Sequence, residues 1–358
     1  MSLPSPGIPA INSTAGTYGD QNNTNGSTCA PYDNELEATV IPVYILMVSV
    51  LGFLLNAFVL MVFCLHKKAC TVAEIYLSNM AAADFILMAF LPFWAVNPAN
   101  KYNWTLPHSL CKLVPLSINV NTYSSIYFLV LISIDRYVAL VLPMSNKRMR
   151  RPKYAKLCCA LVWGFSLLLS VPTLVYREAK YIPDQNVTRC LLNYPNNETF
   201  LLFDVMLLTF GFIIPISIIS YCTLKIIQAL KNRLPQSLKK EQKATTLMLA
   251  VLLAFMICWV PFYLVKILRW LIVFDVLRGC SIRTIVPLCK QIFVYFAFFN
   301  SVLNPILYVI VGKNFRAKVR EVFNKSRIHT TTSFNTNSTR SRLMIGVKTH
   351  GPLFIKRA

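Results

Sequence analysis

The chain has 358 residues, of which 55% are hydrophobic and only 14% are charged, and its formal net charge at pH 7 is +22. Soluble domains carry about 25% charged residues, so this composition argues against a soluble globular protein and predicts side chains that mostly face lipid. The basic residues form short clusters beside apolar stretches without interleaved aromatic residues, which argues against nucleic acid as a partner.

The chain begins with a polar segment, residues 1–38, which is rich in Asn, Ser, Thr and Gly and which we expect to be an extracellular, glycosylated tail. Seven apolar stretches follow, each near the roughly 20 residues that a helix needs to cross a bilayer. They lie at 40–65, 72–98, 108–140, 154–176, 200–229, 242–272 and 286–311. Long continuous runs favour helices over the short alternating segments of a β-barrel. The sequence therefore predicts an all-α, seven-transmembrane helix bundle over residues 39–312.

The distribution of charge predicts the orientation of the bundle. In this layout one side holds 26 of the 36 Lys and Arg residues, among them Lys67, Lys68, Lys147, Arg148, Arg150, Arg151, Lys239, Lys240, Arg316 and Arg320. Short loops rich in Lys and Arg stay in the cytoplasm. We expect a multi-pass plasma-membrane protein with an extracellular N-terminus, a cytoplasmic C-terminus and a basic inner face that contacts anionic lipid.

Glycosylation signals and cysteines agree with this topology. Sequons begin at six residues of the predicted outside: Asn12, Asn22, Asn25, Asn103, Asn186 and Asn197. Four cysteines lie on the same side: Cys29, Cys111, Cys190 and Cys280. Because that compartment is oxidising, we expect two disulfides. Three pairings are possible, of which we favour Cys111 with Cys190 and Cys29 with Cys280.

Asp84 lies alone in the middle of the second stretch, where an ionisable group costs several kcal/mol and is a functional candidate by default. Polar residues of other stretches are placed to surround it: Asn56, Asn121, Ser125, Asn300 and Asn304. Carboxylate, amide and hydroxyl oxygens suit a hard cation or a water-filled network. Hydrogen bonding between helices without an ion is the alternative. No other cofactor and no enzymatic site is expected, because the sequence shows no metal-ligand or nucleophile–base pattern.

The inner end of the third stretch carries Asp135-Arg136-Tyr137, and Glu241 begins the sixth. An ion pair between Arg136 and Glu241 would close the cytoplasmic side, and breaking it would let the sixth helix swing outward. The sixth stretch also holds Phe255, Trp259 and Pro261, and the seventh holds Asn304, Pro305 and Tyr308. Proline kinks a membrane helix and creates a place where two packings compete, although the prolines alone are also consistent with a purely structural bend.

These residues resemble the pattern of rhodopsin-like G-protein-coupled receptors across about residues 40–325. More narrowly, the stretches VFCLHKKACTVAEIYLSNMAAADFIL, LPFWA, YSSIYFLVLISIDRYVALV and NPILYVIVGKNFR are similar to the kinin (bradykinin) receptors, most of all their type-2 subgroup. The resemblance implies a peptide agonist, a Gq-type G protein with calcium release, and desensitisation by receptor kinases and arrestin. A transporter would show internal repeats, and none is apparent.

The resemblance also implies roles for individual residues. G-protein coupling and a resting lock fall to Asp135, Arg136, Tyr137 and Glu241. A sodium site falls to Asp84, Asn121, Ser125 and Asn300. The activation switch falls to Ile126, Pro215, Phe255, Trp259, Pro261, Asn304, Pro305 and Tyr308. Ligand binding falls to Trp94, Asn119, Tyr123, Tyr263, Lys266, Arg269, Lys290 and Gln291.

The outer ends of the last two stretches depart from that pattern. Kinin receptors place acidic residues there, facing a cationic peptide, whereas this chain has Arg269 and Pro287, with Lys266 and Lys290 nearby. Like charges in a partly desolvated site repel unless Glu198, Asp204 or Asp275 compensates them. A more acidic peptide or small ligand is therefore the alternative agonist. A further interpretation is that these basic side chains extend into water or lipid headgroups. Amine and retinal ligands are excluded, because Ile118 and Phe298 replace the charged residues that they need.

Residues 313–325 are predicted to form an amphipathic eighth helix on the membrane, with Val311, Phe315, Val319, Val322 and Phe323 as its apolar side chains. No cysteine follows Cys289, so an acyl anchor is not expected. Residues 326–358 are predicted to be a disordered cytoplasmic tail. Its hydroxyl residues are candidate phosphorylation sites for arrestin docking, or belong to an unmodified solvated tail: Thr330, Thr331, Thr332, Ser333, Thr336, Ser338, Thr339 and Ser341.

Overall fold

The computed structural model describes residues 35–66, 69–142, 151–231, 239–273, 276–277, 280–312 and 315–324. Within these ranges seven helical segments are long and apolar enough to span a membrane: Ala38–Leu65, Val72–Ala99, His108–Leu140, Pro152–Tyr176, Glu198–Lys231, Thr245–Ile272 and Ile292–Ile310. The prediction of seven spans is confirmed.

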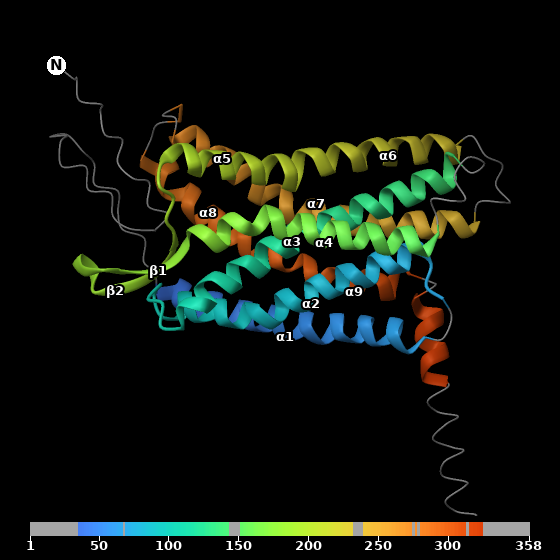
Figure 1. The fold of residues 1–358 in the computed structure, drawn as a ribbon, viewed down its shortest axis with the longest axis horizontal. Helices are drawn as coiled ribbons and strands as arrows, with labels where there is room; N and C mark the ends of the chain where they lie inside the picture. The colour runs from blue at the N-terminus through green and yellow to red at the C-terminus, as the bar shows by residue number, and fades with distance from the viewer. Residues whose placement is uncertain are drawn as a thin grey trace, which may run out of the picture.

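The spans lie side by side along the long axis of the molecule (Figure 1). The first four are α1 (Glu35–Leu65), α2 (Val72–Ala99), α3 (His108–Leu140) and α4 (Pro152–Tyr176). The fifth consists of α5 (Asn197–Leu208), the π-helical turn η2 (Thr209–Ile213) and α6 (Ile214–Lys231). The sixth is α7 (Lys239–Val273), and the seventh consists of α8 (Cys280–Phe298) and α9 (Asn300–Ile310). Large apolar side chains on their outer faces are exposed, as a lipid-facing surface requires: Met47, Leu54, Leu161, Leu168 and Leu224 among others.

The fifth span is interrupted where the sequence predicts one continuous helix over 200–229. Pro215 has no N–H, so it cannot bond to the carbonyl of Gly211 four residues earlier, or to that of Phe210 in a wider turn. The chain widens to a π turn there. Side chains of neighbouring helices take both carbonyls: the Tyr127 hydroxyl donates to Phe210 O at 3.0 Å and the Tyr263 hydroxyl donates to Gly211 O at 3.1 Å.

Proline has the same effect in the seventh span. Pro305 lies inside α9 and cannot donate to the carbonyl of Ser301. The Asn56 side chain of α1 donates to that carbonyl at 2.9 Å and to Gly52 O at 2.8 Å. Asn56 is fully buried, so its amide ties the first helix to the bend in the seventh.

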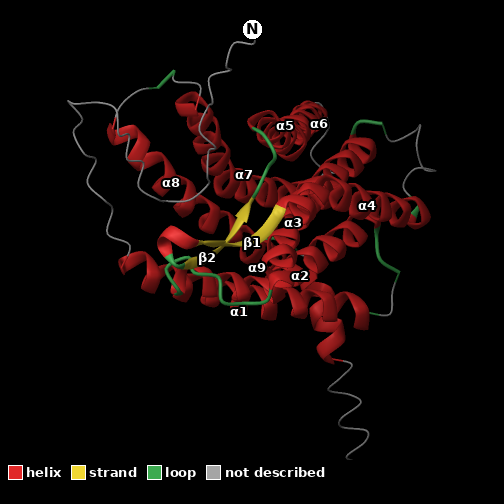
Figure 2. Ribbon diagram, turned by 60° about the vertical axis from the view of Figure 1, so that its left-hand side comes forward, coloured by secondary structure: helices red, strands yellow, loops and turns green. Residues whose placement is uncertain are grey.

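A β-hairpin between the fourth and fifth spans was not predicted. Strands β1 (Arg177–Ile182) and β2 (Val187–Leu192) pair antiparallel, with Arg177 opposite Leu192. The 3₁₀ turn η1 (Pro183–Gln185) joins them, followed by Asn186 at a φ of 50°. The hairpin lies across one end of the bundle (Figure 2). A disulfide between Cys111 of α3 and Cys190 of β2 holds it there, as predicted.

The opposite end carries the short eighth helix, residues 315–324, which follows α9 and lies across the end of α1 (Figure 1). It falls within the predicted range 313–325; residues 313, 314 and 325 are outside the described residues. Phe315 is 5% exposed and packs against aromatic rings of α1 and α9. The disordered tail predicted after residue 326 also lies outside the described residues.

Candidate ligand and signalling sites

The outer ends of α5 and α7 are joined by a polar cluster around Asp204. Its carboxylate accepts from the Lys266 ammonium through Oδ1 and from the Trp270 indole through Oδ2, the latter at 2.6 Å. The side chains of Lys266 and Asp204 are only 10% and 15% exposed. Both acceptor oxygens are occupied, so the negative charge of Asp204 is already compensated within the protein.

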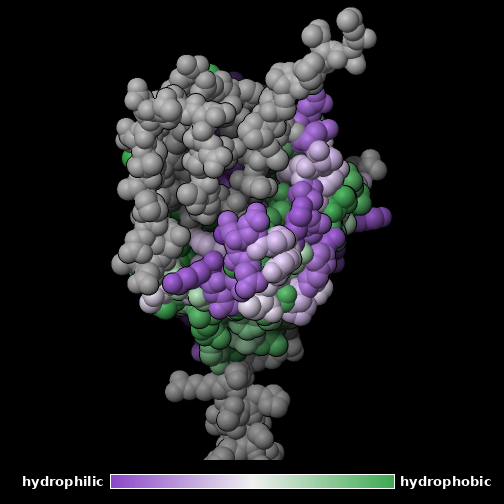
Figure 3. Space-filling model, turned by 90° about the vertical axis from the view of Figure 1, so that its left-hand side faces the viewer, coloured by the Kyte–Doolittle hydropathy of each residue, from purple (hydrophilic) through white to green (hydrophobic). Residues whose placement is uncertain are grey.

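Arg269, Arg177 and Lys290 are basic residues that lie near this cluster. The Arg269 guanidinium stands over the Phe200 ring at 5.5 Å, and that of Arg177 over the Trp94 ring at 5.4 Å. Burial lowers the pKa of Arg177 to about 10, an effect that the neighbouring Tyr194 partly offsets. Its Nε is buried and has no hydrogen-bond acceptor among the described residues. Lys290 of α8 is half-buried. Polar side chains gather on this end of the molecule beside the apolar flank (Figure 3).

The other residues predicted to bind ligand differ in accessibility. Asn119 of α3 donates to the Thr173 hydroxyl of α4, and Trp94 packs against Trp104 at 6.2 Å. Tyr123 and Tyr263 are 3% and 1% exposed, deeper in the bundle. Gln291 belongs to α8, but its side chain lies outside the described residues. The structure thus separates a polar outer layer from a buried tyrosine layer below it.

The tyrosine layer leads to the predicted switch. Tyr263 lies 6.2 Å from Trp259, whose ring stacks on Phe255 at 5.8 Å. Ile126, Phe255 and Pro215 are buried, from α3, α7 and α6 respectively. Pro261 lies within α7 between Trp259 and Tyr263. A change at the outer end therefore has a continuous column of packed side chains through which to act.

Asp84 lies beneath this layer and is 0% exposed. Its carboxylate accepts from Asn121 at 2.8 Å, Ser301 at 2.7 Å and Asn304 at 3.0 Å. Ser125, predicted to belong here, accepts from Asn121 at 3.4 Å. The side-chain oxygens of Asn300 and Asn304 are buried without a partner among the described residues. A buried carboxylate with unpaired amide acceptors fits a small hard cation or water, both of which would supply what these oxygens lack.

Asp135 and Arg136 form the predicted cluster at the inner end of α3. Their side chains make an ion pair, with Arg136 Nε donating to Asp135 Oδ2 at 3.1 Å, and both residues are at most 9% exposed. Tyr137 packs 6.0 Å from Tyr221 of α6. Glu241 belongs to the first turn of α7, but its side chain lies outside the described residues, so its pairing with Arg136 stays a prediction.

Residues 55–308 match the family model described as 7 transmembrane receptor (rhodopsin family). The chain belongs to the rhodopsin family of seven-transmembrane receptors. It is 47% identical over 290 residues to the B2 bradykinin receptor of Homo sapiens, covering 80% of this chain and 74% of the relative. It is 48% identical to the B2 receptor of Sus scrofa, covering 80% and 79%, and 38% identical to the B1 receptor of Homo sapiens, covering 84% and 87%.

Membership of this receptor family establishes a multi-pass plasma-membrane signalling protein rather than an enzyme. Some contacts of the receptor escaped sequence reasoning. Ser301 donates to Asp84, and Trp270 donates to Asp204. Asp204 itself was one of three acids predicted as possible partners of the basic residues, and it pairs with Lys266. Ser301 carried no signal, since serine is common in membrane helices.

Only some of the residues predicted to be glycosylated or to form the second disulfide are among the described residues. Asn186 is exposed at the tip of the hairpin, and the Asn103 side chain accepts from the backbone of Thr188 at 3.0 Å. Asn12, Asn22, Asn25 and Cys29 lie outside the described residues, as do the side chains of Asn197 and Cys280. Glycosylation and the pairing of Cys29 with Cys280 stay predictions.

Proposed function

We propose that the receptor binds an extracellular kinin-type peptide at the outer end of the bundle and activates a Gq-type G protein from its basic inner face, with calcium release as the cellular response. The observation that carries this is likeness to receptors named for bradykinin over 290 and 306 residues, which is 80% and 84% of the chain. The packed column from Tyr263 to Phe255 supports it, because it connects the two ends. The N-terminus would be extracellular and the C-terminus cytoplasmic.

The inner face would be held at rest by Arg136 and released by movement of α7. Arg136 is paired with Asp135 in the described structure, and Glu241 would add a partner from α7. Ligand-driven rotation of α7 about Pro261 would separate α7 from α3 and open a surface for the G protein. Receptor kinases and arrestin would then act on the hydroxyl residues of the tail, which lie outside the described residues.

The charges of the outer end favour an agonist that presents an anionic group there. Asp204 is compensated by Lys266, whereas Arg177 and Arg269 have no ion-pair partner among the described residues. Burial and the neighbouring Arg269 lower the pKa of Lys290 to about 7, so an anionic ligand group beside it would favour its protonated form. A ligand carboxylate beside an arginine forms a charge-assisted hydrogen bond. A free peptide C-terminus or an acidic side chain supplies that group, whereas a cationic peptide end would be repelled.

A calcium assay in transfected cells tests both parts of the proposal. A panel of kinin peptides, each as free acid and as C-terminal amide, is applied to the wild type and to Arg269→Asp. We expect the wild type to respond to a free acid and to lose at least about tenfold in potency with the amide, equivalent to about 1.4 kcal/mol. The Arg269→Asp variant should shift preference towards peptides with cationic ends.

Lys180→Asp is the matched control, because Lys180 is exposed on β1 and the substitution makes the same change of charge. Equal shifts in Lys180→Asp and Arg269→Asp would assign the effect to long-range charge. If the free-acid and amide forms of a peptide are equally potent at the wild type, the proposal that the agonist presents an anionic group is refuted. No response to any kinin by wild-type receptor present at the cell surface would refute the kinin assignment itself.

We further propose that Asp84 and the unpaired oxygen of Asn300 hold a sodium ion as an allosteric ligand of the resting receptor, with Asn121 and Ser125 close by. An ion bound preferentially by the resting state must weaken agonist binding by the same coupling factor. Replacing sodium chloride by choline chloride at equal ionic strength should therefore raise agonist affinity several-fold in the wild type. Asp84→Asn removes the charge and should abolish this difference; persistence of the sodium effect in Asp84→Asn would refute the site.

A further inference from the structure

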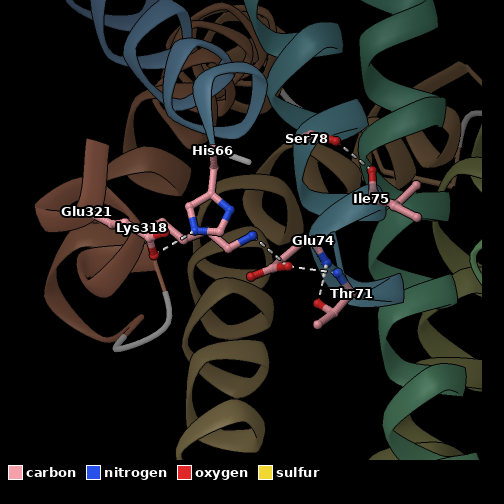
Figure 4. A network of polar contacts seen from close by, with 7 residues as sticks. All are labelled: His66, Thr71, Glu74, Ile75, Ser78, Lys318 and Glu321. Atoms are coloured by element: carbon pink, nitrogen blue, oxygen red, sulfur yellow. Dashed lines mark hydrogen bonds and ion pairs between the residues drawn. The ribbon is translucent and has the colours of Figure 1, made fainter. Parts of the chain in front are cut away.

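The turn between α1 and α2 faces the eighth helix through a set of polar contacts at the cytoplasmic end of the bundle. Figure 4 shows His66, Thr71 and Glu74 from the turn and α2 meeting Lys318 and Glu321 from the eighth helix. None of these residues belongs to the ligand site, the switch or the Arg136 cluster. We call the four charged or ionisable members His66, Glu74, Lys318 and Glu321 the helix 8 clamp.

The inner contact of the clamp is an ion pair between buried groups. Lys318 Nζ lies 3.0 Å from Glu74 Oε2, and both side chains are 10% exposed. Its ammonium also stands 5.7 Å from the centre of the Phe63 ring, which favours a cation. A lysine on a short surface helix would ordinarily extend into water. Here it turns inward, so its position depends on Glu74.

Glu74 has a second task that fixes its side chain. It completes the capping box of α2: Glu74 Oε2 accepts from the backbone of Thr71 at 2.8 Å, and the Thr71 hydroxyl accepts from the backbone of Glu74 at 3.4 Å. A capping box holds a glutamate side chain in one orientation at the helix N-terminus. The carboxylate is therefore pre-positioned before Lys318 arrives.

The outer contact of the clamp is weaker. His66 Nε2 lies 3.3 Å from Glu321 Oε2, and their side chains are 3% and 47% exposed. Its ionic character requires a protonated imidazole, and exposed pairs contribute little. The inner pair is thus the contact on which the position of the eighth helix depends most.

The clamp also fixes an aromatic contact with the seventh span. Phe315 packs against Phe58 and Phe63 of α1 and lies 6.3 Å from Tyr308 of α9. Tyr308 belongs to the predicted activation switch. Lys318 follows Phe315 by three residues, on the same face of the helix. Holding Lys318 therefore keeps Phe315 seated beside Tyr308.

The eighth helix needs such contacts because its own stability is low. Its described residues are 315–324, and isolated helices shorter than about 12–15 residues are marginal in water. The sequence has no cysteine between residues 290 and 358 to carry an acyl chain. Packing of Phe315 and the clamp are the contacts by which the described structure attaches this helix to the bundle.

We propose that Lys318 and Glu74 are positioning residues for signalling: their buried ion pair holds the eighth helix against the first two spans and so presents the cytoplasmic surface that a G protein meets. The structural part stands on the contacts alone, and the signalling part rests on the proposed function.

Hydrogen exchange on the purified full chain in lipid nanodiscs tests the structural part without any ligand. Lys318→Met and Glu74→Gln should each raise exchange of the amides in 316–324 at least tenfold. Gln at position 74 still accepts from Thr71, so the cap of α2 remains. Arg320→Met is the matched control, because Arg320 is exposed on the same helix, and it should leave exchange within threefold of the wild type.

Combining Lys318→Met with Glu74→Gln should raise exchange no further than either single variant, because each single change already removes the pair. Lys318→Arg retains the charge and should restore slow exchange. Unchanged exchange in both single variants, or an equal rise in Arg320→Met, would overturn the clamp.

Nucleotide exchange on a Gq-type G protein in the same nanodiscs tests the signalling part. At saturating agonist, Lys318→Met should lower the maximal rate at least threefold with unchanged agonist affinity, and Lys318→Arg should restore it. If Lys318→Met raises hydrogen exchange in the eighth helix but leaves the maximal rate of nucleotide exchange unaltered, the clamp is structural only and its role in signalling is refuted. Absence of any Gq response in the wild type would instead refute the proposed coupling.

Discussion

Lys266→Met should be among the most destabilising substitutions in the receptor. In the described structure the Asp204 carboxylate, which is 15% exposed, accepts hydrogen bonds from Lys266 and Trp270. The substitution would remove the first of these donors and leave the second. Breaking a buried ion pair by removing one partner costs about 3–5 kcal/mol. We expect the receptor in detergent to have a clearly lower melting temperature, and we expect less receptor at the cell surface.

The double variant Lys266→Met with Asp204→Asn separates charge from packing. Because no buried charge remains, it should recover most of the lost stability. Lys180→Met on the exposed strand is the control and should melt like the wild type. If the single and double variants melt together, the loss of stability does not come from leaving the Asp204 carboxylate buried without its partner.

Gly211→Ala should also destabilise the receptor, through crowding. A Cβ on Gly211 would lie 2.8 Å from the Tyr263 hydroxyl and 3.4 Å from Leu207. Tyr263 has no room to retreat, since it is 1% exposed and stacks on Phe212 at 4.5 Å. Overpacking of this kind costs about 1–3 kcal/mol, and the bond from Tyr263 to Gly211 O would be strained as well.

Gly164 provides the matched comparison, because a Cβ there meets nothing within 4 Å. It lies exposed in α4, where Ala favours the helix by up to about 1 kcal/mol relative to Gly. Thermal melting should therefore fall for Gly211→Ala and stay level or rise for Gly164→Ala. A fall of equal size in both variants would show that the π turn tolerates a methyl group.

The spans were predictable from the sequence because each of them depends on a long apolar run, which no short-range detail overrides. The hairpin was not, since REAKYI and VTRCLL are short, mixed in polarity and separated by only four residues, 183–186. The interruption at Thr209–Ile213 was missed for a related reason. Pro215 signals a lost hydrogen bond, but whether the helix kinks or widens depends on Tyr127 and Tyr263 from other spans.

The candidate sites show the same division. Asp84 and Arg136 could be predicted, because an ionisable residue within or at the end of an apolar run is rare. Their partners were harder. Ser301 and the contact of Lys318 with Glu74 depend on which face each helix turns inward, and the apolar pattern of a helix exposed to lipid does not reveal that face.

Two carbonyls left vacant by proline, at Gly211 and Ser301, are each bound by a side chain from another span, Tyr263 and Asn56 respectively. Exchanging such a bond requires only a rotamer change, whereas exchanging a backbone bond requires a helical turn to unravel. A hydrogen bond of this kind is worth about 1 kcal/mol net. The fifth and seventh spans thus each bend at a hydrogen bond that a side chain of another span can release without melting a helical turn.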